Sequence, residues 1–263
     1  LQQNFVNLPA GHRIAIDEGA DAFHAVPFQA LPEESLVAHS PTLSESLPRD
    51  VQTWLIEPLA APAFSLPDLN GTTQELRSYR GRIVLLLFWS VEAPSSLAAL
   101  HALEKDPALR SGRDIACLAL NVDDTTKLES ARSTARQRRF SFPVLFATEE
   151  IAGVYNLIYR YLFDRRRDLP LPSALLLDGA GRIVRVYQGA VDPGGVLRDS
   201  RSIPANPADR MRLALPFPGI LVQDKLARND FTYGVAMFQH GFFDQAQDWF
   251  LQVLATRPED PDA

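Results

Sequence analysis

The longest hydrophobic run in the sequence extends from Ile83 to Trp89 and has the length of a single strand. Runs that are apolar at every position are typical of strands covered on both faces, as in the centre of a parallel sheet. A second such run extends from Ile115 to Leu120, and a shorter one from Phe142 to Phe146. The pattern therefore predicts a sheet whose central strands are buried.

Two segments between these strands repeat their apolar residues at helical spacing: Leu97, Leu100 and Leu103 in the first, and Leu128, Ala131 and Ala135 in the second. Farther along, Leu175–Leu177 and Ile183–Tyr187 are joined by Asp178-Gly179-Ala180-Gly181, which predicts a hairpin. Strands that alternate with helices and end in a hairpin indicate an α/β fold with a central mixed β-sheet.

The flanking segments differ from this region in composition. Residues 3–28 alternate around Pro9-Ala10-Gly11, which predicts strand, turn and strand, and residues 29–58 are rich in Pro, Ser and Glu, as linkers are. Five prolines after Val191 argue against long regular structure, whereas residues 229–240 and 243–256 predict two helices that turn at Gly241. We therefore divide the chain into short strands (1–28), a linker (29–58), the α/β domain (59–190), a connecting segment (191–226) and a helical hairpin (227–263).

The net charge and the length of the longest apolar run argue against nucleic-acid binding and membrane insertion. The 26 Lys and Arg against 32 Asp and Glu give a net charge of −6, so we expect no nucleic-acid partner. A membrane-spanning helix needs about 20 apolar residues, far more than the run at Ile83, so we expect no membrane insertion.

The cysteine count restricts the chemistry further. Cys117 is the only cysteine, so the chain has no internal disulfide, no two-cysteine redox pair and no thiolate zinc site. The five histidines lie in different segments without metal-ligand spacing, and the sequence contains no phosphate-binding or dinucleotide-binding motif. We therefore expect no metal and no cofactor.

Several short motifs occur in a family-specific order. They are Ala61-Pro62-Ala63-Phe64-Ser65-Leu66, Asp68-Leu69-Asn70-Gly71, Tyr79-Arg80-Gly81-Arg82 before the first buried strand, and Leu171-Pro172-Ser173-Ala174 before the hairpin. With these motifs, residues 59–190 resemble the redoxin branch of the thioredoxin superfamily, which includes alkyl hydroperoxide reductase/thiol-specific antioxidant proteins. The resemblance implies a thioredoxin-like sandwich whose redox site lies in the turn after the first buried strand.

That turn reads Ala93-Pro94-Ser95-Ser96 in this chain. The family uses a Cys-x-x-Cys there, because a helix N-terminus lowers the pKa of the first thiol and the second thiol resolves the mixed disulfide. With Ala93 and Ser96 at the two cysteine positions, the resemblance implies a degenerate site without the family's mechanism. Cys117 lies in an apolar strand and is interpreted as a packing residue, with a redox role as the alternative.

The resemblance also aligns Pro172 with the family's cis-proline, which faces the redox turn. It implies a residual peptide groove formed by Leu171, Pro172, Ser95 and Ser96. We favour the simpler interpretation, a turn retained for structure alone, over the peptide groove.

The two ends of the chain resemble parts of other families. Gly234, Gly241, Phe243, Ala246, Phe250, Leu254 and Pro258 match one tetratricopeptide repeat, and Asn4-Phe5 through Glu18-Gly19 resemble the closing strands of an ASPIC/UnbV module. The first residue is Leu1, and no signal peptide follows it. These resemblances imply a piece of a larger multidomain protein that is exported, either periplasmic or secreted.

Two charged clusters have more than one interpretation. Asp123-Asp124 follows the second buried strand, either as a functional loop or as the capped start of a helix. Arg132, Arg136, Arg138 and Arg139 form a basic stretch, which we interpret as a solvated helix face, with a docking surface as the alternative.

The sequence leaves three functional hypotheses. The first is a redoxin-family domain without thiol redox activity that serves as a structural or protein-interaction module. The second is a thiol–disulfide oxidoreductase or peroxidase that uses Cys117. The third is a peptide-binding module that uses the groove at Pro172. The expected partner in the first and third is a protein or peptide.

Overall fold

The computed structural model describes residues 12–16, 23–27, 51–163, 167–214 and 229–258, and the chain divides into two units, Leu1–Pro48 and Arg49–Ala263. In the first unit, strands β1 (His12–Ile16) and β2 (Phe23–Pro27) are antiparallel. The segment expected to turn at Pro9-Ala10-Gly11 lies outside the described residues.

The second unit contains a sheet of six strands in the order β3-β10-β9-β6-β7-β8. Strands β6, β7 and β8 are parallel, whereas β9 runs antiparallel to β6, and β10 runs antiparallel to both β9 and β3. The strands are β3 (Val51–Ala60), β6 (Ile83–Trp89), β7 (Ile115–Asn121), β8 (Val144–Phe146), β9 (Ser173–Leu177) and β10 (Arg182–Gln188). The expected mixed α/β sheet with its terminal hairpin is confirmed.

One strand begins inside the segment that was expected to be a linker. Strand β3 covers residues 51–60 and pairs with β10, so the sheet starts before residue 59. The proline content of the segment concealed this strand, because Pro58 cannot donate to a ladder. An edge strand tolerates such a residue, since one of its sides has no neighbouring strand.

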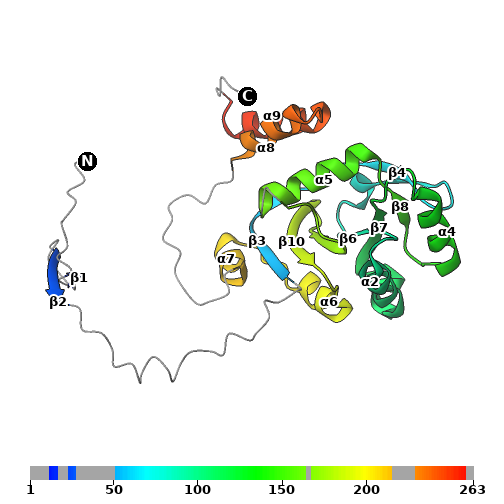
Figure 1. The fold of residues 1–263 in the computed structure, drawn as a ribbon, viewed down its shortest axis with the longest axis horizontal. Helices are drawn as coiled ribbons and strands as arrows, with labels where there is room; N and C mark the ends of the chain where they lie inside the picture. Colours follow the sequence, from blue (N-terminus) through cyan, green and yellow to red (C-terminus); the bar gives the residue numbers. More distant parts are fainter. Residues whose placement is uncertain (1–11, 17–22, 28–50, 164–166, 215–228, 259–263) are drawn as a thin grey trace. The chain divides into compact units, whose positions relative to one another are not determined.

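Helices cover both faces of the sheet (Figure 1). Helix α5 (Glu149–Leu162) lies on one face, and the buried residues of α2, α3, α4 and α6 belong to the core on the other face. These four helices are Pro94–Lys105, Pro107–Ser111, Leu128–Arg138 and Pro193–Arg201. Strands β4 (Ser65–Pro67) and β5 (Thr73–Glu75) form a small separate ladder, which the short 3-10 helix η1 (Leu76–Tyr79) follows. This arrangement is a thioredoxin-like sandwich.

The connecting segment contains two helices that the sequence analysis did not predict. Helix α6 starts at Pro193 and α7 (Pro207–Ala214) at Pro207, so the prolines occupy first helical positions, where no amide donor is needed. The Asp192 carboxylate caps α6 by accepting from the Gly194 amide at 3.1 Å and the Gly195 amide at 2.8 Å. Both helices are short, with nine residues in α6 and eight in α7, so the described part of this segment contains regular structure but no long element.

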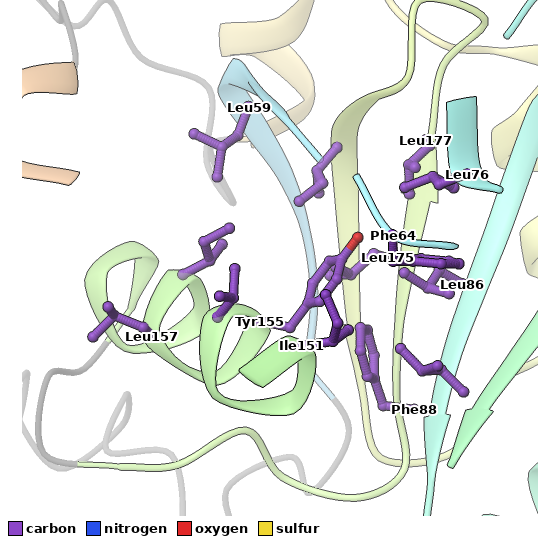
Figure 2. Packing of buried hydrophobic residues seen from close by; sticks show 14 of the residues in the cluster. Leu59, Phe64, Leu76, Leu86, Phe88, Ile151, Tyr155, Leu157, Leu175 and Leu177 are labelled. Carbon is purple, nitrogen blue, oxygen red and sulfur yellow. The ribbon is translucent and has the colours of Figure 1, made fainter. Parts of the chain in front are cut away.

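Strand β6 divides its side chains between two cores. Val84, Leu86 and Phe88 belong to the cluster under α5, whereas Leu85, Leu87 and Trp89 belong to the cluster on the opposite face. Figure 2 shows Tyr155 and Ile151 of α5 pointing toward the sheet beside Phe88 and Phe64. The Tyr155 ring lies 5.0 Å from that of Phe88, and its hydroxyl donates to the Pro62 carbonyl at 2.8 Å.

The chain closes with the predicted helical hairpin, α8 (Asp230–Gln239) and α9 (Phe243–Thr256). Trp249 of α9 stacks on Tyr233 of α8 at 4.9 Å, and Tyr233 contacts the ring of Tyr161 in α5 at 5.7 Å. Gly234 allows the close approach of α9, since a Cβ placed on it would lie 2.6 Å from the Phe250 ring. The hairpin thus shares the core under α5.

We predict that Gly234→Ala destabilises the hairpin by about 1–3 kcal/mol, because the added methyl group overlaps the Phe250 ring. Urea denaturation followed by circular dichroism measures the change. Adding Phe250→Leu to this variant should recover part of the loss, whereas Gln239→Ala, at an exposed position of α8, should change stability by less than about 0.5 kcal/mol. Equal stability of Gly234→Ala and the unmodified protein would contradict this packing.

Candidate redox turn

The turn that the sequence analysis singled out links β6 to α2. Ala93 is the N-cap of α2, with φ −103° and ψ 99°, and Pro94 occupies the first helical turn. The Ser96 amide donates to the Ala93 carbonyl at 2.8 Å, so positions 93 and 96 lie one helical turn apart. The structure thus places both residues that the resemblance aligns with the family's cysteines, Ala93 and Ser96, at a helix N-terminus.

The two serines of this turn have opposite environments. Ser95 is exposed, whereas Ser96 is completely buried, in line with Ala99, Leu100 and Leu103 on the inner face of α2. The Ser96 hydroxyl makes no hydrogen bond within the described residues. A buried hydroxyl without a partner costs folding free energy, so Ser96 contributes little stability through its polar atom.

The loop before β9 lies against this turn. The Leu171–Pro172 peptide bond is cis, as the resemblance implied, and Pro172 is buried. The Ser95 hydroxyl donates to the Leu171 carbonyl at 3.5 Å, and the Gly189 amide donates to the Pro172 carbonyl at 2.9 Å. The fold therefore brings Ser95 and Leu171 together, although 76 residues separate them in the chain.

The Asp123 side chain links the turn to the end of β7 by hydrogen bonds. Its carboxylate accepts from the Val91 amide at 2.9 Å, from the Asn121 side-chain amide at 2.7 Å, and from the Ser90 hydroxyl. Sequence reasoning noted Asp123 in a possible functional loop but missed this role, because Ser90 is 33 residues away. The sequence signal was an acidic residue shortly after a buried strand, since β7 ends at Asn121.

The neighbouring Asp124 caps a turn rather than the helix itself. Its carboxylate accepts from the Thr126 amide at 2.9 Å and from the Lys127 amide at 3.2 Å, while α4 begins at Leu128. The hydrogen bond from the Thr126 hydroxyl lowers the pKa of Asp124. The expected helix start at Asp124 is therefore displaced by one short turn.

Cys117 lies away from the redox turn, in the middle of β7. It pairs with Leu85 in the parallel register, four residues before the pair of Trp89 and Asn121, which is roughly 13 Å along a strand. Only 4% of the residue is exposed. Burial, with smaller effects from Asp106 and Glu104, raises the pKa of the Cys117 thiol to about 12.

Neither a metal centre nor a membrane span is found where the chain is described. Within those residues, no three His, Cys, Asp or Glu side chains are grouped as metal ligands would be. No described helix has the length and apolar character to cross a bilayer.

Residues 59–186 match the sequence profile of the AhpC/TSA family. Among curated proteins, the chain is 26% identical over 144 residues to the thiol-disulfide oxidoreductase ResA of Geobacillus kaustophilus, covering 54% of this chain and 75% of that protein. It is 27% identical over 135 residues to the thioredoxin-like protein YneN of Bacillus subtilis, covering 50% and 71%.

Solved structures include a thiol:disulfide interchange protein from Chlorobium tepidum, with a TM-score of 0.48 and 18% identity over 56% of this chain and 97% of that one. A thioredoxin from Neisseria meningitidis has a TM-score of 0.44 and 23% identity, covering 56% and 91%. The profile match, the strand order and the loop at Pro172 fall in the same part of the chain. Residues 59–186 are therefore an AhpC/TSA thioredoxin-like redoxin domain.

Proposed function

We propose that this redoxin domain does not catalyse thiol–disulfide exchange and serves as a protein-interaction or structural module. The observation that supports this proposal most strongly is the position of the only thiol in the chain. The chain has a single thiol, Cys117, buried in β7, and the turn at the N-terminus of α2 has none. The resemblance to a tetratricopeptide repeat in α8 and α9 supports an interaction role.

Thiol–disulfide exchange requires a thiolate that attacks one sulfur of a disulfide and a second thiol that releases the mixed disulfide. Ala93 has no nucleophile, and the Ser96 hydroxyl neither ionises near neutral pH nor forms a disulfide. The rest of the turn has the geometry that would support such a thiolate: a helix N-terminus and a facing cis-proline. On this proposal the scaffold has been retained and the reactive atoms have been lost.

The first test restores the sulfur. The double variant Ala93→Cys/Ser96→Cys should accelerate insulin reduction by dithiothreitol about tenfold or more, because the helix N-terminus favours a thiolate at position 93. The two positions are one helical turn apart, within the span of a disulfide, and the Ser96 hydroxyl has no hydrogen bond to lose in the described part of the chain. The single variant Ala93→Cys is the control, since it lacks a resolving thiol.

The unmodified protein should not exceed the uncatalysed rate in the same assay. Turnover by the unmodified protein that Cys117→Ser abolishes would overturn the proposal and favour the alternative oxidoreductase or peroxidase that uses Cys117. Turnover that survives Cys117→Ser would also contradict it, since it would require a catalytic group other than sulfur.

We predict that Cys117 reacts with an aromatic disulfide reagent on the order of a hundredfold more slowly in the native than in the denatured protein. Burial keeps the reagent away from the sulfur, and the raised pKa of the thiol, about 12, keeps the sulfur protonated near neutral pH. Raising the pH from 7 to 9 should leave the native thiol slow, because both values lie well below this pKa. Rapid reaction at pH 7 in the native state would contradict the burial of this strand.

A second candidate function is peptide binding at the loop before β9. The contact of the Ser95 hydroxyl with the Leu171 carbonyl favours it, because it places an exposed side chain beside a backbone group outside the ladder of the sheet. An extended peptide could pair with such a backbone edge. Ser96 and Pro172, also named as groove residues, are both buried, so they would support the groove from beneath.

Titration with a mixture of extended heptapeptides, followed by amide NMR shifts, tests this candidate. The expected shifts are centred on Ser95 and Leu171 and decrease at least about threefold in Ser95→Trp, whose side chain would obstruct the edge. Exposed Ala98, about one turn farther along α2, gives the control as Ala98→Trp, which adds the same ring away from the edge. Shifts confined to α8 and α9 would count against the groove and would support an interaction through the hairpin.

We propose the wider context on resemblance alone. The motifs of residues 4–19 and the hairpin at 227–263 suggest a multidomain protein in which this domain lies between an ASPIC/UnbV module and tetratricopeptide packing. Such a context implies an extracytoplasmic location.

A further inference from the structure

A cleft of about 1110 Å³ opens beside the redox turn. It lies beyond the carboxyl ends of β7 and β8 and is bounded by α4, by the first two turns of α5 and by the β4 segment. In open α/β sheets, the carboxyl ends of parallel strands are where ligands bind. Its volume slightly exceeds the usual range of ligand pockets, roughly 300–1,000 Å³, so a ligand with a sizeable apolar body fits.

The interior of the cleft is mainly apolar. Its largest apolar contributors come from four separate segments: Leu66 and Leu69 around β4, Val122 after β7, Phe146 at the end of β8, and Leu171 before Pro172. These side chains, Leu66 apart, are only partly buried. An apolar ligand would therefore remove exposed hydrocarbon from water on both sides of the contact.

The ionised side chains of the lining give this apolar cleft a negative charge. Two guanidinium groups, those of Arg132 and Arg136, face five carboxylates, those of Asp68, Asp123, Asp124, Glu149 and Asp168. Five negative charges against two positive charges leave a formal charge of −3 on the lining.

Ion pairs with side chains next to the cleft leave this charge unchanged. The Arg160 guanidinium lies 3.8 Å from the Asp168 carboxylate, and the Glu129 carboxylate lies 3.2 Å from the Arg132 guanidinium. Each pair is neutral, so one acid and one base of the lining are set aside together. Four carboxylates and one guanidinium group remain, and their formal charge is again −3.

The other cations near the cleft do not reverse this sign. Lys127, three residues after Asp124, lies outside the lining, and its ammonium pairs with the Glu92 carboxylate at 2.5 Å. Arg136, one turn beyond Arg132 on α4, makes no hydrogen bond or ion pair in the part of the chain that the structure describes. It therefore offsets one of the four carboxylates and leaves the cleft negative.

Two of the carboxylates are held in fixed positions on either side of strand β8. Asp68 forms a bridge with Leu145 of β8, and its carboxylate accepts from two backbone amides at 2.8 and 3.0 Å. Asp123 comes two residues after β7, the other neighbour of β8, and its carboxylate accepts from a backbone amide at 2.9 Å. Neighbouring strands lie about 4.8 Å apart, so the two segments are separated by roughly 10 Å, with the end of β8 between them. These hydrogen bonds orient the carboxylates and leave their charge intact.

We propose that this cleft binds a small amphiphilic cation, an apolar body that carries one protonated amine. The amine lies between Asp68 and Asp123, and the body covers Val122, Phe146 and Leu171. An ammonium group donates charge-assisted hydrogen bonds to carboxylates, and charges at an apolar wall interact more strongly than charges in bulk water. The site is independent of the function proposed for the redox turn, because it uses no group at positions 93 or 96.

Titration calorimetry at low ionic strength with octylammonium, octanol and octanoate tests the proposal, because the three probes share one apolar chain and differ in charge. Octylammonium should bind about tenfold more tightly than octanol, and octanoate should bind more weakly than octanol. Raising the salt concentration to about 0.5 M should lower the preference for the cation at least about threefold, since the Debye length then falls to about 4 Å.

Charge variants of the lining test the sign and the place of the attraction. Asp68→Asn/Glu149→Gln changes the charge of the lining to −1 and should lower the preference for octylammonium over octanol at least about threefold. Arg136→Gln changes it to −4 and should raise the affinity for octylammonium about twofold. The matched controls change the same charges outside the cleft and should keep the original preference: Asp244→Asn/Asp248→Asn on α9 and Arg138→Gln on α4.

A further variant tests the location of the apolar body. Ala152→Phe places a ring in the cleft from α5 without changing any charge, and it should weaken octylammonium and octanol about tenfold or more, whereas the same substitution outside the cleft, Ala98→Phe on α2, should not. Amide NMR spectra confirm that each variant remains folded. Equal affinity of the unmodified protein for octylammonium and octanol, tighter binding of octanoate, no measurable binding, or unchanged binding in Ala152→Phe would each overturn the assignment.

Discussion

The central strand β6, buried from Val84 to Trp89, is the constraint on which the rest of the domain depends. It forms hydrogen bonds with β7 on one side and β9 on the other, and its alternating side chains supply both cores, so it has no exposed face or edge. Such a strand can change neither register nor direction without moving a whole hydrophobic set. The end of β6 therefore fixes where α2 begins, and with it the position of the redox turn.

The polar contacts at that end explain how the turn keeps a defined shape without a cysteine. Asp123 accepts three hydrogen bonds that join the β6–α2 loop to β7, and the loop before β9 closes on the turn from the other side. These contacts belong to the backbone and to the side chains of Ser90, Ser95, Asn121 and Asp123, and none requires a thiol. Loss of sulfur at positions 93 and 96 is therefore compatible with an intact fold, as proposed, and leaves a buried hydroxyl that has no partner among the described residues.

Helix α5 connects the remaining features of the molecule. Its inner face carries Tyr155 into the sheet core, and its C-terminal part contacts α8 through Tyr161. Its N-terminal turns form one wall of a surface cleft of about 1110 Å³ at the carboxyl ends of β7 and β8. The hairpin and the cleft thus use separate parts of one helix.

The sequence alone determined the features that rest on local pattern: the buried strands at Ile83 and Ile115, the helices between them, the hairpin at its Gly-containing turn and the single thiol. Tertiary structure decided the features that rest on distant partners. Strand β3 exists because β10 pairs with it, Asp123 holds the turn because Ser90 lies opposite, and the cleft combines segments from Leu66 to Leu171. The periodicity of apolar residues indicates which face of a helix or strand is buried. The residues that pack against that face come from distant parts of the chain, and a local sequence pattern does not identify them.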